Sequence, residues 1–270
     1  MKKLTTKQIA LTSTFAAILT IVSRLPGIPI LGGAGHIEFT TIFYPFIGIV
    51  MGPWSGMLAV LIGNFVLWLI PTTTMLGLLM IPAGAIAALM SGLLSRRVGW
   101  SNWKLAATVI AALNLLWYLT PVGVESPLYP VLHWLALVLI LAFRDKIVEF
   151  MERESATTKM TIGVALCSYI ATMAEHMTGN LIFISSVGLV VPLKQVRDAI
   201  KALGLIWLKL GIPSMPFTGE GGLGTLFMLV LPVTAVERLA ITLLATLIGV
   251  ASIRILGRAR LLVPSKTDIK

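Results

Sequence analysis

Charged side chains are scarce in this chain, since Asp, Glu, Lys and Arg make up only 12% of its 270 residues. Soluble domains carry about 25% charged residues. The longest gap runs from Glu38 to Arg96 and contains no charged residue at all. A stretch of this kind excludes the solvated surface that an ordinary soluble domain needs.

Cysteine and the common catalytic motifs are equally sparse. Cys167 is the single cysteine, so an internal disulfide is excluded. No H-x-x-x-H or H-E-x-x-H spacing supports a metal site, and no G-x-S-x-G supports a serine hydrolase. No glycine-rich phosphate loop is present either. We therefore expect no catalytic residues, no metal, no cofactor and no ATP hydrolysis by this chain.

Apolar residues dominate instead, at 57% of the chain with a mean hydropathy of +0.95. A spanning helix needs about 20 mostly apolar residues, so the chain can hold roughly eight membrane segments. The sequence predicts an all-α, polytopic integral membrane protein made of a single membrane domain, residues 1–270. The expected segments are 8–24, 38–51, 54–70, 75–95, 104–120, 131–149, 160–187 and 229–256.

Two of these segments have special features. Segments 38–51 and 54–70 are short and meet at Gly52-Pro53, which predicts a tight helical hairpin because Pro can open a helix but not continue one. Segment 131–149 is apolar only as far as Phe143, and Arg144 follows. It is the weakest of the eight.

Positive charges predict the orientation of the chain in the membrane. Lys and Arg gather at alternate segment ends in four groups: Lys2, Lys3 and Lys7; Arg96, Arg97 and Lys104; Arg144, Lys146, Arg153 and Lys159; and Arg254, Arg258, Arg260, Lys266 and Lys270. Both termini are therefore expected in the cytoplasm, in a multi-pass protein of the cell membrane. The net charge of +10 comes from Lys and Arg that gather at the segment ends, where they set the orientation of the chain in the lipid bilayer. Nucleic acid is therefore not expected as a partner.

Residues 188–228 depart from this charge pattern, because they form an outer stretch that still carries Lys194, Arg197, Lys201 and Lys209. Charged and apolar residues alternate at helical spacing in the first half of the stretch. This half is expected to form an amphipathic helix along the membrane surface. The second half is rich in Pro and Gly and is expected to be a loop.

Polar groups at membrane depth are costly, so the few that occur are candidates for function. Ser168, Thr172, His176 and Asn180 recur every four residues, with Glu175 beside them. Asn64 and Trp68 share a helix face, and Glu38 lies at the same outer level. An outward-facing pocket for a small organic molecule is predicted, with these substrate-binding residues: Glu38, Asn64, Trp68, Glu175, His176 and Asn180.

A structural alternative remains open for these polar residues, since hydroxyls and amides also join helices without touching a ligand. We expect that role for Ser168 and Thr172. Glu237 and Arg238 are adjacent in the last segment. They are expected to point to different sides and to need separate partners.

Small residues form two further stripes. Gly84, Ala88 and Gly92 recur every four residues in the fourth segment, where close packing within the chain is expected. Ser13 and Ala17 lie on one side of the first segment, a terminal helix whose small face could equally meet a partner subunit.

Four features together resemble the substrate-binding S components of energy-coupling factor (ECF) vitamin transporters. They are a basic N-terminus before Ser13-x-x-x-Ala17, a loop Leu31-Gly-Gly-Ala-Gly-His36, a hairpin at Gly52-Pro-Trp-Ser-Gly56, and a small-residue helix ending at Arg96-Arg97. The resemblance is best over residues 1–97. Two departures are Ser13 in place of the first residue of the family's alanine pair, and about eight segments around the family's six-helix core.

The resemblance implies a subunit that captures a vitamin or related micronutrient from outside. It implies as partners a transmembrane coupling subunit, docked at Ser13 and Ala17, and two cytoplasmic ATPases. Residues 26–37 would gate the site. Two alternatives stay open from the residues alone: a self-contained small-solute carrier, and an intramembrane enzyme acting on a lipid or prenyl substrate.

Overall fold

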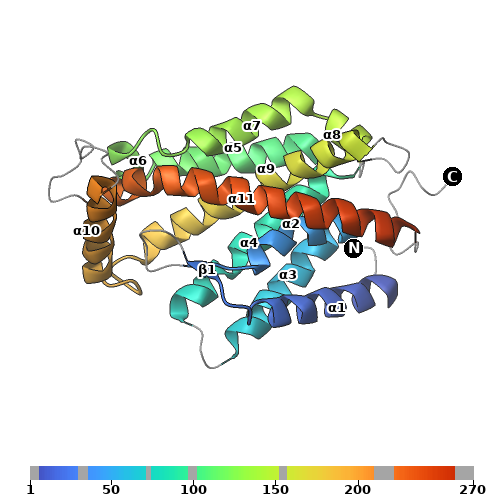
Figure 1. Cartoon of the computed structure of the whole chain (residues 1–270), viewed down its shortest axis with the longest axis horizontal. Coiled ribbons are helices and arrows are strands. Elements are labelled where there is room, and N and C mark those ends of the chain that lie inside the picture. The colour runs from blue at the N-terminus through green and yellow to red at the C-terminus, as the bar shows by residue number, and fades with distance from the viewer. Residues whose placement is uncertain are drawn as a thin grey trace.

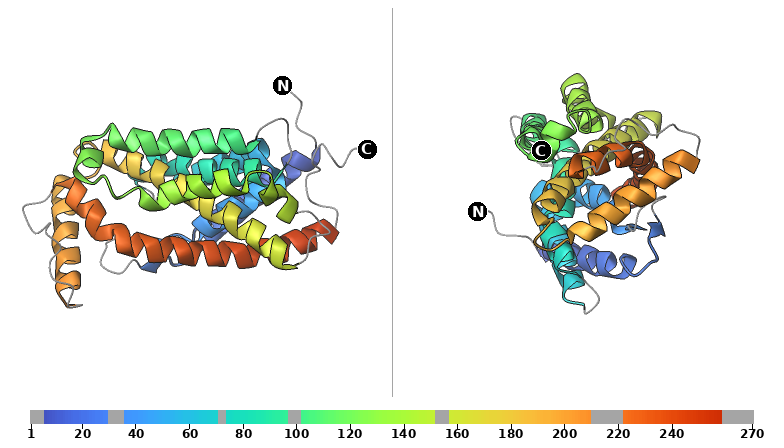
Figure 2. Two further views of the ribbon diagram at one scale, coloured as in Figure 1. Left: turned by 90° about the horizontal axis from the view of Figure 1, so that it is seen from above. Right: turned by 90° about the vertical axis from the view of Figure 1, so that its left-hand side faces the viewer.

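The computed structural model describes residues 6–29, 36–70, 74–96, 102–151, 157–209 and 222–258, and within them the chain forms an elongated bundle of helices (Figure 1). Most of the long helices run along the axis of the bundle. One helix, α10, crosses the bundle at one end, which we call the α10 end (Figure 2). The expected all-helical architecture is confirmed for this part of the chain, with one small exception described below.

Eleven helices occur in the described residues, and each of the eight expected segments overlaps at least one of them. Their bounds are α1 Thr6–Val22, α2 Thr40–Met51, α3 Pro53–Trp68, α4 Met75–Leu94, α5 Asn102–Tyr118, α6 Pro121–Glu125, α7 Val131–Phe143, α8 Lys146–Phe150, α9 Thr157–Ser186, α10 Leu193–Lys209 and α11 Leu223–Arg258.

A short antiparallel strand pair is the exception to the all-helical expectation. Strand β1, Ile28–Pro29, pairs with β2, His36–Ile37. Each strand has only two residues, which is too short to show an alternating apolar pattern. Hydropathy therefore could not predict these strands. Most of the loop Leu31-Gly-Gly-Ala-Gly-His36 falls outside the described residues, as do Arg97 and both ends of the chain.

The hairpin of α2 and α3 is confirmed. Gly52 joins the two helices with φ of 86°, a left-handed conformation that favours glycine, and Pro53 opens α3. Gly56 lies against Gly48, since a Cβ added to Gly56 would come within 2.9 Å of the Gly48 Cα. The two helices can therefore approach closely.

Helix α4 lies at the centre of the packing, against α2, α3 and α9. A Cβ on Gly48 of α2 would be 2.0 Å from the carbonyl oxygen of Ala88, and one on Gly92 would be 2.5 Å from the backbone nitrogen of Pro53. The small residues of α4 thus allow backbones to touch, which confirms their expected role in packing within the chain.

The expected segment 131–149 is not one helix, which corrects the sequence analysis. Helix α7 ends at Phe143, where Arg144 adopts φ of 43°, and the separate helix α8 follows. Positive φ is costly for a residue with a Cβ and cannot continue a helix. Thirteen residues of α7 span about 20 Å, less than the hydrocarbon core of about 30 Å.

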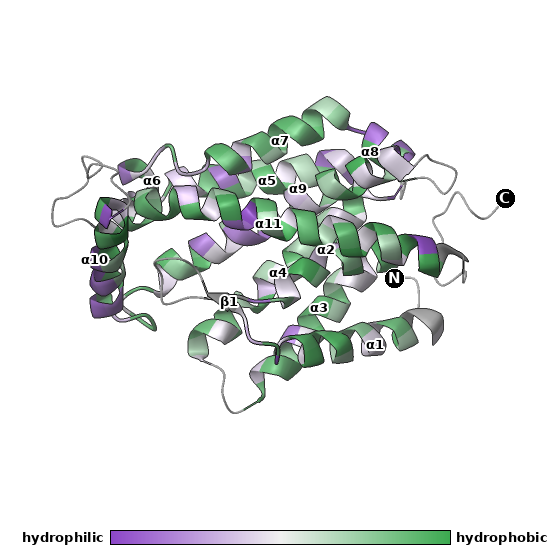
Figure 3. Cartoon of the chain, in the orientation of Figure 1, coloured by the Kyte–Doolittle hydropathy of each residue, from purple (hydrophilic) through white to green (hydrophobic). Residues whose placement is uncertain are grey.

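Two helices of the described chain, α4 and α11, are each long and apolar enough to cross a membrane. Hydrophobic residues predominate along most of the helices of the bundle (Figure 3), and many large apolar side chains are exposed. On α11, Val236, Leu243 and Leu247 are each about two-thirds exposed. Contiguous exposed apolar surface of this kind is expected where lipid surrounds a protein and not where water does.

Helix α10 has the amphipathic character expected for the first half of residues 188–228. Its buried Val196 and Leu203 face the bundle, while Lys194, Arg197 and Lys201 are exposed. Trp207 fixes the helix to α11 by donating a hydrogen bond from Nε1 to the Leu229 carbonyl oxygen at 3.1 Å. Its contact with the membrane surface remains a prediction.

Candidate functional site

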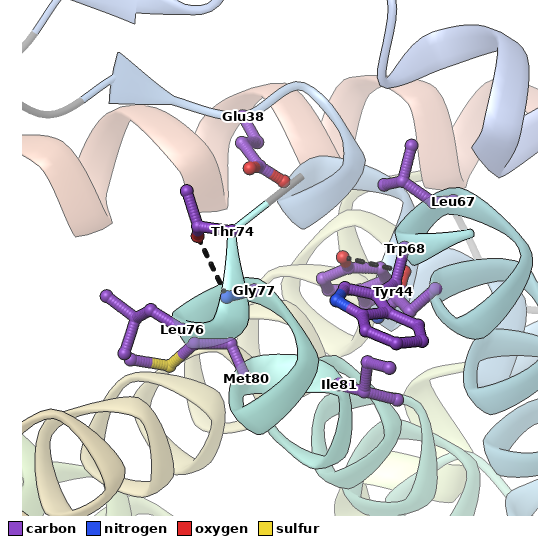
Figure 4. Close-up of a pocket in the computed structure, with 10 residues that line it drawn as sticks. Glu38, Tyr44, Leu67, Trp68, Thr74, Leu76, Gly77, Met80 and Ile81 are labelled. Atoms are coloured by element: carbon purple, nitrogen blue, oxygen red, sulfur yellow. Dashed lines mark hydrogen bonds between the residues drawn. The ribbon is translucent and has the colours of Figure 1, made fainter. Parts of the chain in front are cut away.

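A cavity of about 280 Å³ lies between α2, α3 and α4 at the α10 end (Figure 4). Hairpin geometry creates it, because α2 begins, α3 ends and α4 begins at this level. The described residues that line it are Glu38, Tyr44, Asn64, Leu67, Trp68, Thr74, Leu76, Gly77, Met80 and Ile81. Its wall is thus largely apolar with a few polar groups, the usual composition of a small-molecule site.

A hydrogen bond between two helices sets the polar floor of the cavity. The Tyr44 hydroxyl donates to Asn64 Oδ1 at 3.2 Å, and both side chains are buried. Gly84 of α4 leaves room for this pair, since a Cβ there would come within 2.6 Å of Tyr44 Cε2. The Asn64 carbonyl is thereby oriented, and its amide group lies next to the cavity.

Glu38 is exposed and lies at the rim of the cavity (Figure 4). The buried Thr40 donates a hydrogen bond to its carboxylate at 3.1 Å. Across the cavity, Thr74 caps α4 by accepting from the Gly77 backbone N–H at 3.2 Å. The rim therefore carries the carboxylate of Glu38, and the half-buried ring of Trp68 lines the same cavity.

The α9 residues of the predicted site form a second group, behind the wall of the cavity. A hydrogen bond of 3.1 Å joins His176 Nδ1 to His133 Nε2, and the two rings stack at an angle of 6°. Asn180 Nδ2 donates to the Tyr129 hydroxyl at 3.0 Å. A Cβ added to Gly179 would lie 3.7 Å from the sulfur of Met80, which lines the cavity, so α9 packs against this part of the cavity wall without lining the cavity itself.

An ion network adjoins the histidines. Arg238 of α11 lies 3.6 Å from Glu175 of α9 and also donates to Glu237. The expectation of separate partners for Glu237 and Arg238 is therefore wrong. Both side chains are long enough to turn toward each other, and pairing avoids an isolated charge in an apolar interior.

The roles expected for Ser168 and Thr172 are also not those observed. Thr172 Oγ1 donates to the Tyr169 carbonyl oxygen of its own helix, and Ser168 Oγ has no hydrogen-bond partner among the described residues. Neither joins two helices. A hydroxyl in a helix readily bonds to the carbonyl of the preceding turn, which sequence spacing does not reveal.

The structure thus separates the six predicted residues into two groups. Glu38, Asn64 and Trp68 meet in the cavity, while Glu175, His176 and Asn180 lie in the polar cluster beside it. Sequence reasoning missed two tyrosines. Tyr44 donates a hydrogen bond to Asn64 in the cavity, and Tyr129 accepts one from Asn180 in the polar cluster. A tyrosine in an apolar run was the available signal, since a buried phenol usually has a hydrogen-bond partner.

The small face of α1 points away from the bundle. Ser13 and Ala17 are exposed, whereas Phe15 and Leu19 are buried and Leu19 packs against Gly63 of α3. This surface is smooth, and no described residue of the chain covers it. Its use as a docking face remains a prediction.

Comparison with known proteins agrees with the resemblance drawn from the sequence. Residues 3–124 match the family model of the ECF-type riboflavin transporter S component. The resemblance to S components is confirmed by this match. That family consists of membrane transport subunits and not of enzymes.

One curated relative, an uncharacterized protein of Methanocaldococcus jannaschii, is 28% identical to the chain. The aligned region covers 55% of this chain and 56% of the relative, so the chain spans about half of that relative's length. No solved structure matches the chain.

Proposed function

We propose that this chain is the membrane-embedded, substrate-binding subunit of an ECF-type importer, which captures a vitamin or related micronutrient with high affinity. The observation that carries the proposal is the match of residues 3–124 to the S-component family, because every described residue of the cavity lies inside the matched region. The family name makes riboflavin the first compound to test.

The composition of the cavity supports a planar organic substrate with a few polar atoms. Trp68 offers an aromatic face, and Asn64 offers an amide whose carbonyl is already oriented by Tyr44. Such groups give apolar contact over most of a small molecule and fix its orientation. Glu175, His176 and Asn180 are proposed as a further, deeper part of the same site.

The exposed face of α1 supports docking to a coupling subunit. Ser13 and Ala17 permit the close helix approach that small residues allow in a membrane. The proposal places ATP hydrolysis in two partner ATPases, as in the family that the chain resembles.

Both chain termini are proposed to lie in the cytoplasm, with roughly eight membrane segments between them. In support, the start of α1 and the end of α11 lie at the same end of the bundle, opposite α10 (Figure 1). The α10 end, and with it the cavity, then faces outward.

The test uses the purified chain and the reconstituted complex. Riboflavin binding is measured by quenching of tryptophan fluorescence, and native mass spectrometry of gently purified protein identifies any other bound compound. Uptake into liposomes should require the coupling subunit, the ATPases and ATP. Accumulation by the chain alone would establish a self-contained carrier instead, and conversion of a bound lipid would establish an enzyme.

A further inference from the structure

Helix α10 crosses the bundle at the level where α4 begins. Leu76, the second residue of α4, packs against the apolar cluster that includes Val196 and Leu203 of α10. Helix α4 has 20 residues, and its length of about 30 Å matches the thickness of the hydrocarbon core. When α4 crosses the membrane, its two ends lie near the two membrane interfaces. Helix α10 then lies at one interface and runs along the membrane, because it lies across the bundle axis (Figure 2).

Packing fixes one side of α10 against the bundle. Val196 and Leu203, seven residues apart on the same helix face, are buried. Trp207 continues this face four residues later, and its Nε1 donates a hydrogen bond to the Leu229 carbonyl oxygen of α11 at 3.1 Å. Tryptophan is enriched at membrane interfaces, which agrees with the level of the helix. The opposite side of α10 is thereby held away from the bundle.

Three basic residues recur on this open side and form what we call the α10 basic stripe: Lys194, Arg197 and Lys201. They are spaced by three and four residues, so they share a helix face, and all three are exposed. Among the described residues, none of the three takes part in an ion pair. Asp198 is the single acidic residue of α10, against four basic ones. The exposed side of the helix is therefore strongly positive.

Apolar residues continue the same stripe toward the end of α10. Leu205 and Leu208 follow Lys201 at intervals of four and three residues, and they are 59% and 56% exposed. Water is an unfavourable neighbour for two large apolar side chains. The open side of α10 thus combines positive charge with apolar surface, as helices at a membrane interface do.

We propose that the α10 basic stripe binds the anionic headgroups of phospholipids, with Leu205 and Leu208 against the adjoining acyl chains. Lys and Arg have long apolar stems, which let their charges reach phosphate groups from a helix at this level. Each such residue near an anionic bilayer strengthens binding by about five-fold. An acidic soluble partner would meet the same charges, but it would leave the level of α10 and its exposed leucines unexplained. The inference goes beyond transport, because it concerns how the α10 end is held in the membrane whichever compound the chain carries.

The first test measures which lipid the purified full chain retains. Native mass spectrometry compares bound phosphatidylglycerol, which is anionic, with phosphatidylcholine, which carries no net charge. The stripe variant should lower phosphatidylglycerol retention by about five-fold or more; it combines Lys194→Gln, Arg197→Gln and Lys201→Gln. Asp198→Asn removes a negative charge beside the stripe and should raise retention.

A charge-matched control removes three exposed basic residues at the opposite end of the bundle (Figure 1) and should keep the lipid preference. It combines Lys146→Gln, Lys159→Gln and Arg254→Gln. A loss as large in this control as in the stripe variant, or no loss in the stripe variant, overturns the proposal.

The second test places the lipid at α10 itself. In a Cys167→Ala background, a nitroxide on Gly204→Cys shares the face of the stripe, where an added Cβ meets no described atom within 4 Å. In nanodiscs that contain phosphatidylglycerol, this label should be less accessible to a water-soluble nickel reagent than in phosphatidylcholine alone. The stripe variant should remove the difference, and the control variant should retain it. Equal accessibility in both lipids overturns the proposal, since anionic lipid would then not lie on α10.

Discussion

Two asparagines can show which polar group of the molecule touches the substrate. Asn64 lies in the cavity, and Asn180 lies in the cluster behind it. Removing one substrate hydrogen bond costs about 1–1.5 kcal/mol, so Asn64→Ala and Asn180→Ala should each weaken binding by about ten-fold. Titration of tryptophan fluorescence with riboflavin, or with the compound identified by native mass spectrometry, measures this.

Asn102→Ala is the matched control, because Asn102 bonds to the Arg96 carbonyl oxygen far from the cavity. It should leave affinity unchanged. If Asn180→Ala behaves like Asn102→Ala while Asn64→Ala does not, the substrate site is the cavity alone.

Arg238 should matter most to stability among the charged residues. It is buried between Glu175 and Glu237, so Arg238→Met leaves two carboxylates without a counter-charge. Breaking a buried pair in this way destabilises a protein by about 3–5 kcal/mol. Thermal unfolding in detergent measures the loss, and the exposed Arg254→Met is the control, expected within about 0.5 kcal/mol of the parent. Equal effects of the two variants would refute the buried network.

At the scale of elements, the close contact between α2 and α4 depends on glycine at position 48, which has no side chain. Gly48→Val would force a Cβ within 2.0 Å of the Ala88 carbonyl oxygen and 2.1 Å of Ser91 Oγ. Since backbone cannot yield cheaply, the variant should lose the folded bundle, as detected by gel filtration and circular dichroism. Gly204→Ala on α10 meets nothing within 4 Å and should be tolerated, because alanine also favours helix by about 1 kcal/mol. A well-folded Gly48→Val protein would mean that α2 and α4 do not touch as described.

The sequence predicted those elements whose cause is local. Gly52-Pro53 fixed the hairpin, and the spacing of small residues in α4 identified its packing face. The break at Arg144 was missed, because a left-handed residue other than glycine is imposed by tertiary structure. In the same way, spacing put Asn64 and Trp68 on one face. No pattern within α9 could show that Asn180 would bond to Tyr129 and not line the cavity.

At the scale of the whole molecule, the orientation in the membrane can be tested at its C-terminus. Positive charge near the segment ends predicts that Ser265 is cytoplasmic. In a Cys167→Ala background, Ser265→Cys should resist an impermeant thiol reagent in intact cells and react after lysis. The exposed Leu189→Cys, at the α10 end, should react in intact cells. The reverse pattern would turn the cavity toward the cytoplasm.

Assembly of the importer is expected to depend on the smooth face of α1. Ala17→Trp adds a bulky ring on the exposed side of the helix, where it should disturb no contact among the described residues. It should hold a partner helix away and abolish uptake into liposomes, while substrate binding by the isolated subunit persists. The buried face supplies a contrast, since Ala16→Trp should damage the fold itself. Undiminished uptake by Ala17→Trp would exclude this face as the docking surface.

The described wall of the cavity comes entirely from residues 38–81, three consecutive helices joined by short connections. Closing such short loops costs little chain entropy, so this wall can form while later parts of the chain are still being synthesised. The network around Arg238, and the contacts of Phe227 with Trp117 and Tyr129, instead require α11, which lies far from these helices in sequence. The cavity and the network around Arg238 therefore have different folding histories. The cavity is assembled early from neighbours in sequence, and the network is completed only when α11 docks.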